Sequence, residues 1–92
     1  MELRFEWDEV KSRSNRDKHS VTFAEAATVF GDALSVLIPD PLHSESEDRF
    51  TLLGQSQRQR LLVVVHTERD GAIRLISARS ATARERRNYE EG

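Results

Sequence analysis

The 92-residue sequence contains no cysteine, so neither disulfides nor a thiolate metal site can support the fold. No apolar run approaches about 18 residues, which excludes a membrane-spanning helix, and the first nine residues lack the basic and apolar regions of a signal peptide. We therefore expect a cytoplasmic protein with no membrane association. Since single domains typically hold about 50 to 250 residues, we also expect one domain over residues 1–92.

Cofactor and metal motifs are absent as well. The sequence has no P-loop, no G-x-G-x-x-G and no G-x-S-x-G, and its three histidines, His19, His43 and His66, do not form an H-x-x-x-H pair. We expect no cofactor and no metal, and this lack of motifs argues against a small metabolic enzyme.

The net charge of -2 conceals an uneven distribution. Residues 1–57 carry six bases and eleven acids, whereas residues 58–87 carry eight bases, all arginine, and three acids. The arginine guanidinium is a planar fork that matches phosphate or carboxylate, so the second block is a candidate anion-binding region. A solvated charged face is the alternative interpretation.

The hydrophobic pattern predicts an α+β fold, in which an antiparallel sheet of about four strands is joined by two N-terminal helices and one C-terminal helix. Asp8 and the Thr22/Glu25 capping box mark the first two helix starts, and Asp70-Gly71 marks a hairpin. Ser80 is the expected cap of the last helix. The predicted helices are 9–18, 22–30 and 81–90, and the predicted strands are 34–38, 49–55, 60–67 and 72–79, with a short extra strand at 3–7.

The last hairpin allows a prediction of which side chains share a face. With a two- or four-residue loop, opposing residue numbers sum to an odd value, which places His66 and Arg79 on one face and Arg74 on the other unless a bulge intervenes. His66 and Arg79 would then lie roughly 13 Å apart along the strands. We expect them to contact two parts of one extended ligand.

The polar residues include every group needed for metal-independent RNA cleavage. That reaction requires a base for the 2'-hydroxyl, an acid for the leaving oxygen and cations for the phosphorane charge. The arginines supply the cations, and the acid and base candidates are His66, Glu47, Glu85, Lys18 and Tyr89.

Each candidate also has a structural interpretation. Arg79 could pair with Glu47 or Glu85, and His66 could be a half-buried structural histidine. Lys18 and His19 could complement the dipole at the end of a helix. Glu85 and Tyr89 could form an exposed helical pair.

Several motifs, in order along nearly the whole chain, resemble the BrnT family of toxins from type II toxin-antitoxin systems. The most specific are R-L-I-S-A-R (74–79) and E-R-x-x-Y (85–89). The others are F-E-W-D (5–8), Asn15 with Lys18-His19, V-T-F-A-E-A (21–26), Phe30, Asp40 with His43-Ser44, Glu47 with Arg49, and Gly54.

The resemblance implies a RelE-like fold and a ribonuclease that arrests growth by cutting RNA. It also implies a BrnA-like antitoxin, whose ribbon-helix-helix region binds operator DNA, so that the complex represses its own operon. The alternative is a catalytically weak or inactive module that binds the antitoxin and acts as co-repressor.

The resemblance also implies candidate roles for residues in the matching motifs. Arg74 and Arg79 would contact phosphate and the transition state, and His66 would act as acid or base. Because the predicted register puts only one of the two arginines on the face of His66, we favour Arg79 for the site and expect Arg74 to be structural unless a bulge intervenes. Glu47 would be catalytic beside the substrate-binding Arg49, with Glu45 and Asp48 as competitors for its role. Tyr89 would lie at the rim of the site, and Lys18 and His19 are second candidates for substrate binding.

Overall fold

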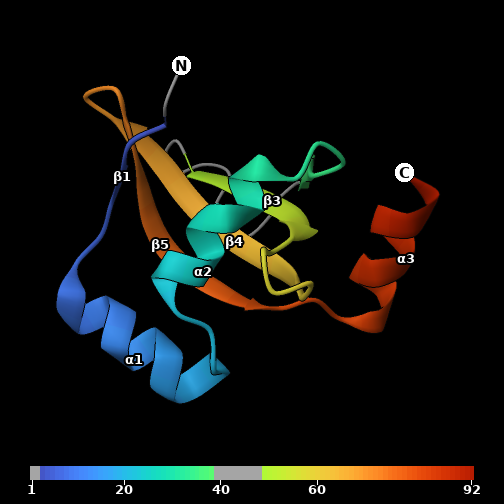
Figure 1. The fold of residues 1–92 in the computed structure, drawn as a ribbon, viewed down its shortest axis with the longest axis horizontal. Helices are drawn as coiled ribbons and strands as arrows, with labels where there is room; N and C mark the ends of the chain where they lie inside the picture. The colour runs from blue at the N-terminus through green and yellow to red at the C-terminus, as the bar shows by residue number, and fades with distance from the viewer. Residues whose placement is uncertain (1–2, 39–48) are drawn as a thin grey trace.

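The computed structural model of the chain describes residues 3–38 and 49–92. Within these ranges five strands form one sheet in the order β1-β5-β4-β3-β2 (Figure 1). The strands are β1 (Phe5–Glu6), β2 (Val36–Ile38), β3 (Arg49–Gln55), β4 (Leu61–Arg69) and β5 (Ala72–Ser80). The helices are α1 (Glu9–His19), α2 (Phe23–Thr28), the short 3-10 helix η1 (Val29–Gly31) and α3 (Ala83–Glu91).

This architecture confirms the α+β prediction, with one difference in the sheet. Strands β2 to β5 form the expected antiparallel meander, and the extra N-terminal strand is present as β1. That strand pairs parallel to β5, so the sheet is mixed. The predicted hairpin turn is confirmed, since Asp70 and Gly71 have φ values of 51° and 78°, as a two-residue turn with two left-handed positions requires.

The first two helices begin where the sequence predicts. The Asp8 carboxylate accepts the backbone N–H groups of Val10 and Lys11, and the Thr22 hydroxyl accepts that of Glu25. The second helix is shorter than predicted because it tightens into η1 after Thr28. In Figure 1, α2 lies over the sheet, α1 runs beside β5, and α3 stands apart from both.

The cap predicted for the last helix was wrong. Ser80 belongs to β5, and Thr82 is the N-cap of α3. The Thr82 hydroxyl accepts the Glu85 backbone N–H while the Glu85 carboxylate accepts the Thr82 backbone N–H, which completes a capping box. The sheet hydrogen bonding of β5 extends through Ser80 and therefore outcompetes an earlier helix start.

The sheet has two differently covered sides. We call the side that packs against α2 and η1 the α2 side; its core contains Phe23, Val29, Leu62, Val64 and Leu75. The opposite side, here the α3 side, holds a smaller cluster of three buried residues, Leu53, Leu61 and Val63. Tyr89 of α3 packs against this cluster, as do Val36 and Ile38 of β2 and Ala81. The α3 side therefore has much less apolar covering, and its remaining surface carries polar residues.

Asn15 joins α1 to the edge of the sheet. Its side-chain nitrogen donates to the carbonyls of Val21 and Ala78 at 3.0 and 2.8 Å, and its side-chain oxygen accepts the Ala78 N–H at 3.1 Å. β1 pairs only with Ile73 and Arg74, so β5 has no neighbouring strand on this edge at Ala78. The side-chain amide of Asn15 takes the place of that strand and satisfies both backbone groups of Ala78. This explains why α1 has only one buried residue yet keeps a defined position along β5.

Candidate active site

Three polar residues form a row across the α3 side of the sheet. Strand pairing places Arg49 of β3 opposite Thr67 of β4, and Thr67 opposite Arg74 of β5. Directly opposed residues point to the same side of a sheet, and neighbouring strands lie about 4.8 Å apart, so the two arginines flank the threonine with Cα atoms roughly 10 Å apart. We call these three residues the arginine row.

The arginine row lines an open pocket of about 450 Å³. Glu6, the partner of Arg74 in β1, approaches the Arg74 guanidinium at 3.7 Å. The pocket wall itself contains one carboxylate, that of Glu68, and four cationic side chains, which makes the site electropositive. Its lining residues are Lys11, Arg49, Thr67, Glu68, Arg69, Arg74 and Ile76.

The predicted sharing of a face by His66 and Arg79 was wrong because a β-bulge interrupts the hairpin. His66 pairs with Leu75 but Val65 pairs with Ser77, so Ile76 is an extra residue in β5. The extra residue reverses the side assignment of every later β5 residue. Arg79 consequently lies on the α3 side with Arg74, and His66 lies on the α2 side.

Arg79 is engaged by a carboxylate, as one of the alternatives from sequence anticipated. Its Nη1 and Nη2 donate to the two carboxylate oxygens of Glu85 at 2.8 and 2.9 Å. This bidentate bond is the main cause that lowers the pKa of Glu85 to about 2 and raises that of Arg79. The pair ties the first turn of α3 to the end of β5.

His66 is surrounded by aromatic rings. It is only 5% exposed, its ring contacts Phe30 edge-to-face at 4.8 Å, and it stacks on Phe50 at 5.6 Å. Burial lowers the pKa of His66, and its Nδ1 atom has no hydrogen-bond partner among the described residues. A neutral imidazole in this position contributes to the core of the α2 side.

Tyr89 connects α3 to the loop before β2. Its hydroxyl donates to Oδ2 of Asp32 at 2.7 Å, and the same carboxylate accepts the backbone N–H groups of Leu34 and Gln55. Burial opposes ionisation of Asp32, but the Gln55 and Tyr89 hydrogen bonds outweigh it and hold the pKa of Asp32 below its usual value. The bond to Asp32 raises the pKa of Tyr89.

The other predicted site residues occupy separate places. Lys18 and His19 are exposed in the last turn of α1, where the positive charge of Lys18 complements the helix dipole. Glu47, with its competitors Glu45 and Asp48, lies outside the described residues. Of the predicted set, the structure brings Arg49 and Arg74 together in one pocket.

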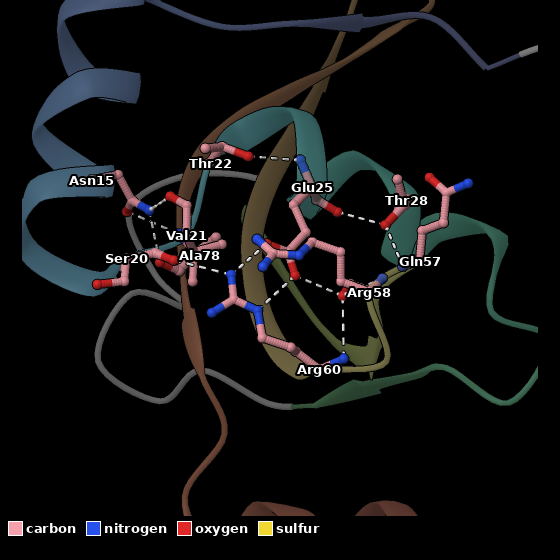
Figure 2. A network of polar contacts seen from close by, with 11 residues as sticks. Asn15, Ser20, Val21, Thr22, Glu25, Thr28, Gln57, Arg58, Arg60 and Ala78 are labelled. Carbon is pink, nitrogen blue, oxygen red and sulfur yellow. Dashed lines mark hydrogen bonds and ion pairs between the residues drawn. The ribbon is translucent and has the colours of Figure 1, made fainter.

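Reasoning from sequence missed a buried ion-pair network centred on Glu25 (Figure 2). The Arg60 guanidinium makes a double hydrogen bond to the Glu25 carboxylate, and the Ser56 hydroxyl donates to it at 2.7 Å. Arg60 also donates to the Ser20 carbonyl at 3.0 Å. These contacts lower the pKa of Glu25, with the Arg60 bond as the largest cause, and join α1, α2 and the turn before β4.

The contributions of Lys11 and Thr67 to the pocket were also missed. Thr67 could have been found, because strand register alone places it between two arginines. Lys11 had no such signal, since its position depends on how α1 packs beside β5. In the described part of the chain no group of three or more histidine, aspartate or glutamate side chains is placed to hold a metal ion, and no helix there is long and apolar enough to cross a membrane.

Comparison with known proteins identifies a family and a similar solved structure. The family model described as "Ribonuclease toxin, BrnT, of type II toxin-antitoxin system" matches residues 7–85. The crystal structure of the Brucella abortus ribonuclease toxin BrnT superimposes with a TM-score of 0.68 and 24% sequence identity, covering 88% of this chain and 99% of that one. At this identity the match shows a shared fold. No curated protein matches the sequence.

Proposed function

Since this chain belongs to the BrnT family of ribonuclease toxins of type II toxin-antitoxin systems, we propose that it is a metal-independent endoribonuclease and that the arginine row binds the RNA backbone. The observation that carries this assignment is the strand register that aligns Arg49, Thr67 and Arg74 on one side of the sheet. Because RNA is the proposed substrate, we also propose that the toxin acts in the cytoplasm.

The arginine row has the chemistry that a phosphate diester requires. Two guanidinium forks roughly 10 Å apart can contact neighbouring parts of a phosphate backbone, and the Thr67 hydroxyl between them is a further hydrogen-bonding group. Lys11 and Arg69 add positive charge to the same pocket. Because phosphate neutralisation dominates nucleic-acid affinity, this local charge matters more than the overall charge of -2.

Cleavage at this site needs no redox partner. The RNA 2'-hydroxyl attacks the neighbouring phosphorus, the bond to the 5'-oxygen breaks, and the products are a 2',3'-cyclic phosphate and a 5'-hydroxyl. One group takes the proton from the 2'-hydroxyl and another gives a proton to the leaving oxygen. Arg49 and Arg74 would stabilise the added negative charge on the phosphorane.

The remaining predicted catalytic residues receive different assignments. We keep Glu47 as the predicted acid or base, since it precedes Arg49 closely in the sequence. We assign Arg79 and Tyr89 to positioning roles because short hydrogen bonds tie them to Glu85 and Asp32, and His66 because aromatic rings bury it. These roles predict that substituting any of the three residues lowers activity only as far as it destabilises the fold.

A type II toxin has an antitoxin partner. We propose that this partner is a BrnA-like protein, that it neutralises the toxin by binding it, and that its ribbon-helix-helix region takes the complex to operator DNA. Co-expression of the toxin with a short ribbon-helix-helix protein, if one is encoded in the next reading frame, tests the assignment. Copurification of the two proteins and recovery of growth would support it, and growth arrest with no complex would contradict it.

The direct test of the ribonuclease is cleavage of RNA by the purified protein in the presence of EDTA. The Arg49→Ala/Arg74→Ala double variant should lose cleavage, and the matched control Arg87→Ala, an exposed arginine of α3, should keep it. Loss of cleavage by the unmodified protein in EDTA would contradict a metal-independent reaction. Equal activity of the double variant and the control would contradict the site.

One observation favours the second candidate function, a catalytically weak co-repressor. Three predicted catalytic residues, His66, Arg79 and Tyr89, make contacts that hold the fold together. If the purified protein cleaves no RNA under any of these conditions yet strengthens binding of its antitoxin to operator DNA, the co-repressor function replaces the ribonuclease.

A further inference from the structure

Helix α1 carries exposed cations outside the core, and one of them, Lys11, lines the pocket of the arginine row. Lys11, Arg13, Arg16 and Lys18 are all exposed, and Asn15 is the one buried residue of the helix. Because the Asn15 side chain bonds both backbone groups of Ala78, the orientation of α1 about its own axis is set relative to β5. The direction in which each cation points therefore follows from helix geometry.

Lys11, Ser14 and Lys18 lie on one flank of α1. Their spacing of three and then four residues places them in line along a helix of 3.6 residues per turn, and the two lysines are about 10 Å apart along the axis. Lys11 lines the pocket of the arginine row, so this flank adjoins the α3 side of the sheet. Arg13 points in nearly the opposite direction, about 200° around the helix from Lys11.

Polar contacts hold the C-terminal end of α1, next to Lys18. The Asn15 nitrogen donates to the Val21 carbonyl just beyond the helix, and Arg60 donates to the Ser20 carbonyl (Figure 2). The Asp17 carboxylate contacts Arg16 at 3.7 Å, so the acid nearest to Lys18 in the sequence has its own cationic partner on the helix. The flank itself contains two lysines and a serine, and no carboxylate.

We propose that the flank of Lys11, Ser14 and Lys18 continues the RNA-binding surface from the arginine row, so that a single strand of RNA lies along the β5 edge of the sheet. This inference rests on the proposed function of the row. A row of roughly 10 Å followed by a flank of about 10 Å gives a path several nucleotides long. Positive grooves that follow the backbone are typical of single-strand binding without sequence preference.

The test measures binding of RNA that the protein cannot cut. Fully 2'-O-methylated oligomers lack the attacking hydroxyl, so their affinity is measured at equilibrium for lengths of four and twelve nucleotides over a range of salt concentrations. Lys18→Gln should weaken the twelve-nucleotide oligomer several-fold and reduce its salt slope by about 0.7, as expected for one lost phosphate contact on a single strand. The four-nucleotide oligomer should bind unchanged.

Arg13→Gln is the matched control, because it removes the same charge from the same exposed helix on the opposite flank. An equal effect of Lys18→Gln and Arg13→Gln would overturn the inference, since it would show a response to total charge alone. If Lys18→Gln has no effect while Arg74→Ala loses binding, the flank does not bind RNA and the arginine row does. Unchanged binding in Arg74→Ala would reject the row, and the proposed function with it.

Discussion

Replacing Glu85 by glutamine removes the negative charge that joins α3 to the sheet and keeps the size of the side chain. The Arg79 bond holds the pKa of Glu85 at about 2 against an ordinary value of 4.5. Each pKa unit corresponds to about 1.4 kcal/mol, which gives an upper value of about 3 kcal/mol. Since the Arg79 side chain is 42% exposed, solvent screens the pair, and we expect a loss of about 1 to 2 kcal/mol at pH 7.

The pH dependence of this loss follows from the direction of the shift. A carboxylate with a lowered pKa in the folded state stabilises the protein above the pKa of the unfolded chain, and that contribution disappears as pH falls from about 4.5 to 2. Urea denaturation of the unmodified protein and Glu85→Gln at pH 7 and pH 3 measures the difference, which should shrink to less than half at pH 3. Glu91→Gln, at the far end of α3, is the control for loss of charge. A Glu85→Gln effect at pH 7 no larger than that of Glu91→Gln would show that the Arg79–Glu85 pair adds no stability of its own.

Three further substitutions test the packing around the sheet. Asn15→Ala leaves both backbone groups of Ala78 without their partner and should cost about 2 to 4 kcal/mol in urea denaturation; a loss under about 1 kcal/mol would contradict the edge-capping role. Gly54→Ala places a Cβ atom 2.8 Å from Val29 Cγ1 and should lower Tm by about 5 to 15 °C, whereas an unchanged Tm in a thermal scan would show that the contact relaxes. Burial lowers the pKa of His66, so the unfolded chain takes up its proton first and stability falls below about pH 6.5. His66→Phe should reduce the urea-midpoint difference between pH 7.5 and 5.5, and an identical difference in both proteins would assign it to other groups.

The fold could be predicted from the sequence because its signals are local. Capping residues such as Asp8 and Thr22 mark helix starts, and Asp70-Gly71 specifies a two-residue turn. The parallel pairing of β1 with β5 is a long-range choice with no local signal. The N-cap at Thr82 was missed because Ser80 offers the same chemistry two residues earlier.

The candidate site was harder to predict because one extra residue in β5 changes which side chains share a side of the sheet. The bulge at Ile76 contains no glycine, and its mark in the sequence is the adjacent apolar pair Leu75-Ile76, where the alternation of apolar and polar residues changes phase. The bulge moves Arg79 to the side of Arg74 and away from His66. Arg49 and Arg74 were predicted as substrate-binding residues from the family resemblance, and the register places them in one pocket. The partner of Arg79 was named among the alternatives, but the choice between Glu47 and Glu85 required the position of α3.

The proposed function requires that the arginine row stabilises the transition state of RNA cleavage. The single-turnover cleavage rate at saturating protein measures this stabilisation, because saturation removes differences in RNA binding. Arg74→Ala should lower this rate by about 100-fold or more, the usual effect of removing one group that stabilises developing charge, while Arg87→Ala keeps the unmodified rate. An Arg74→Ala rate within about twofold of that control would contradict the claim.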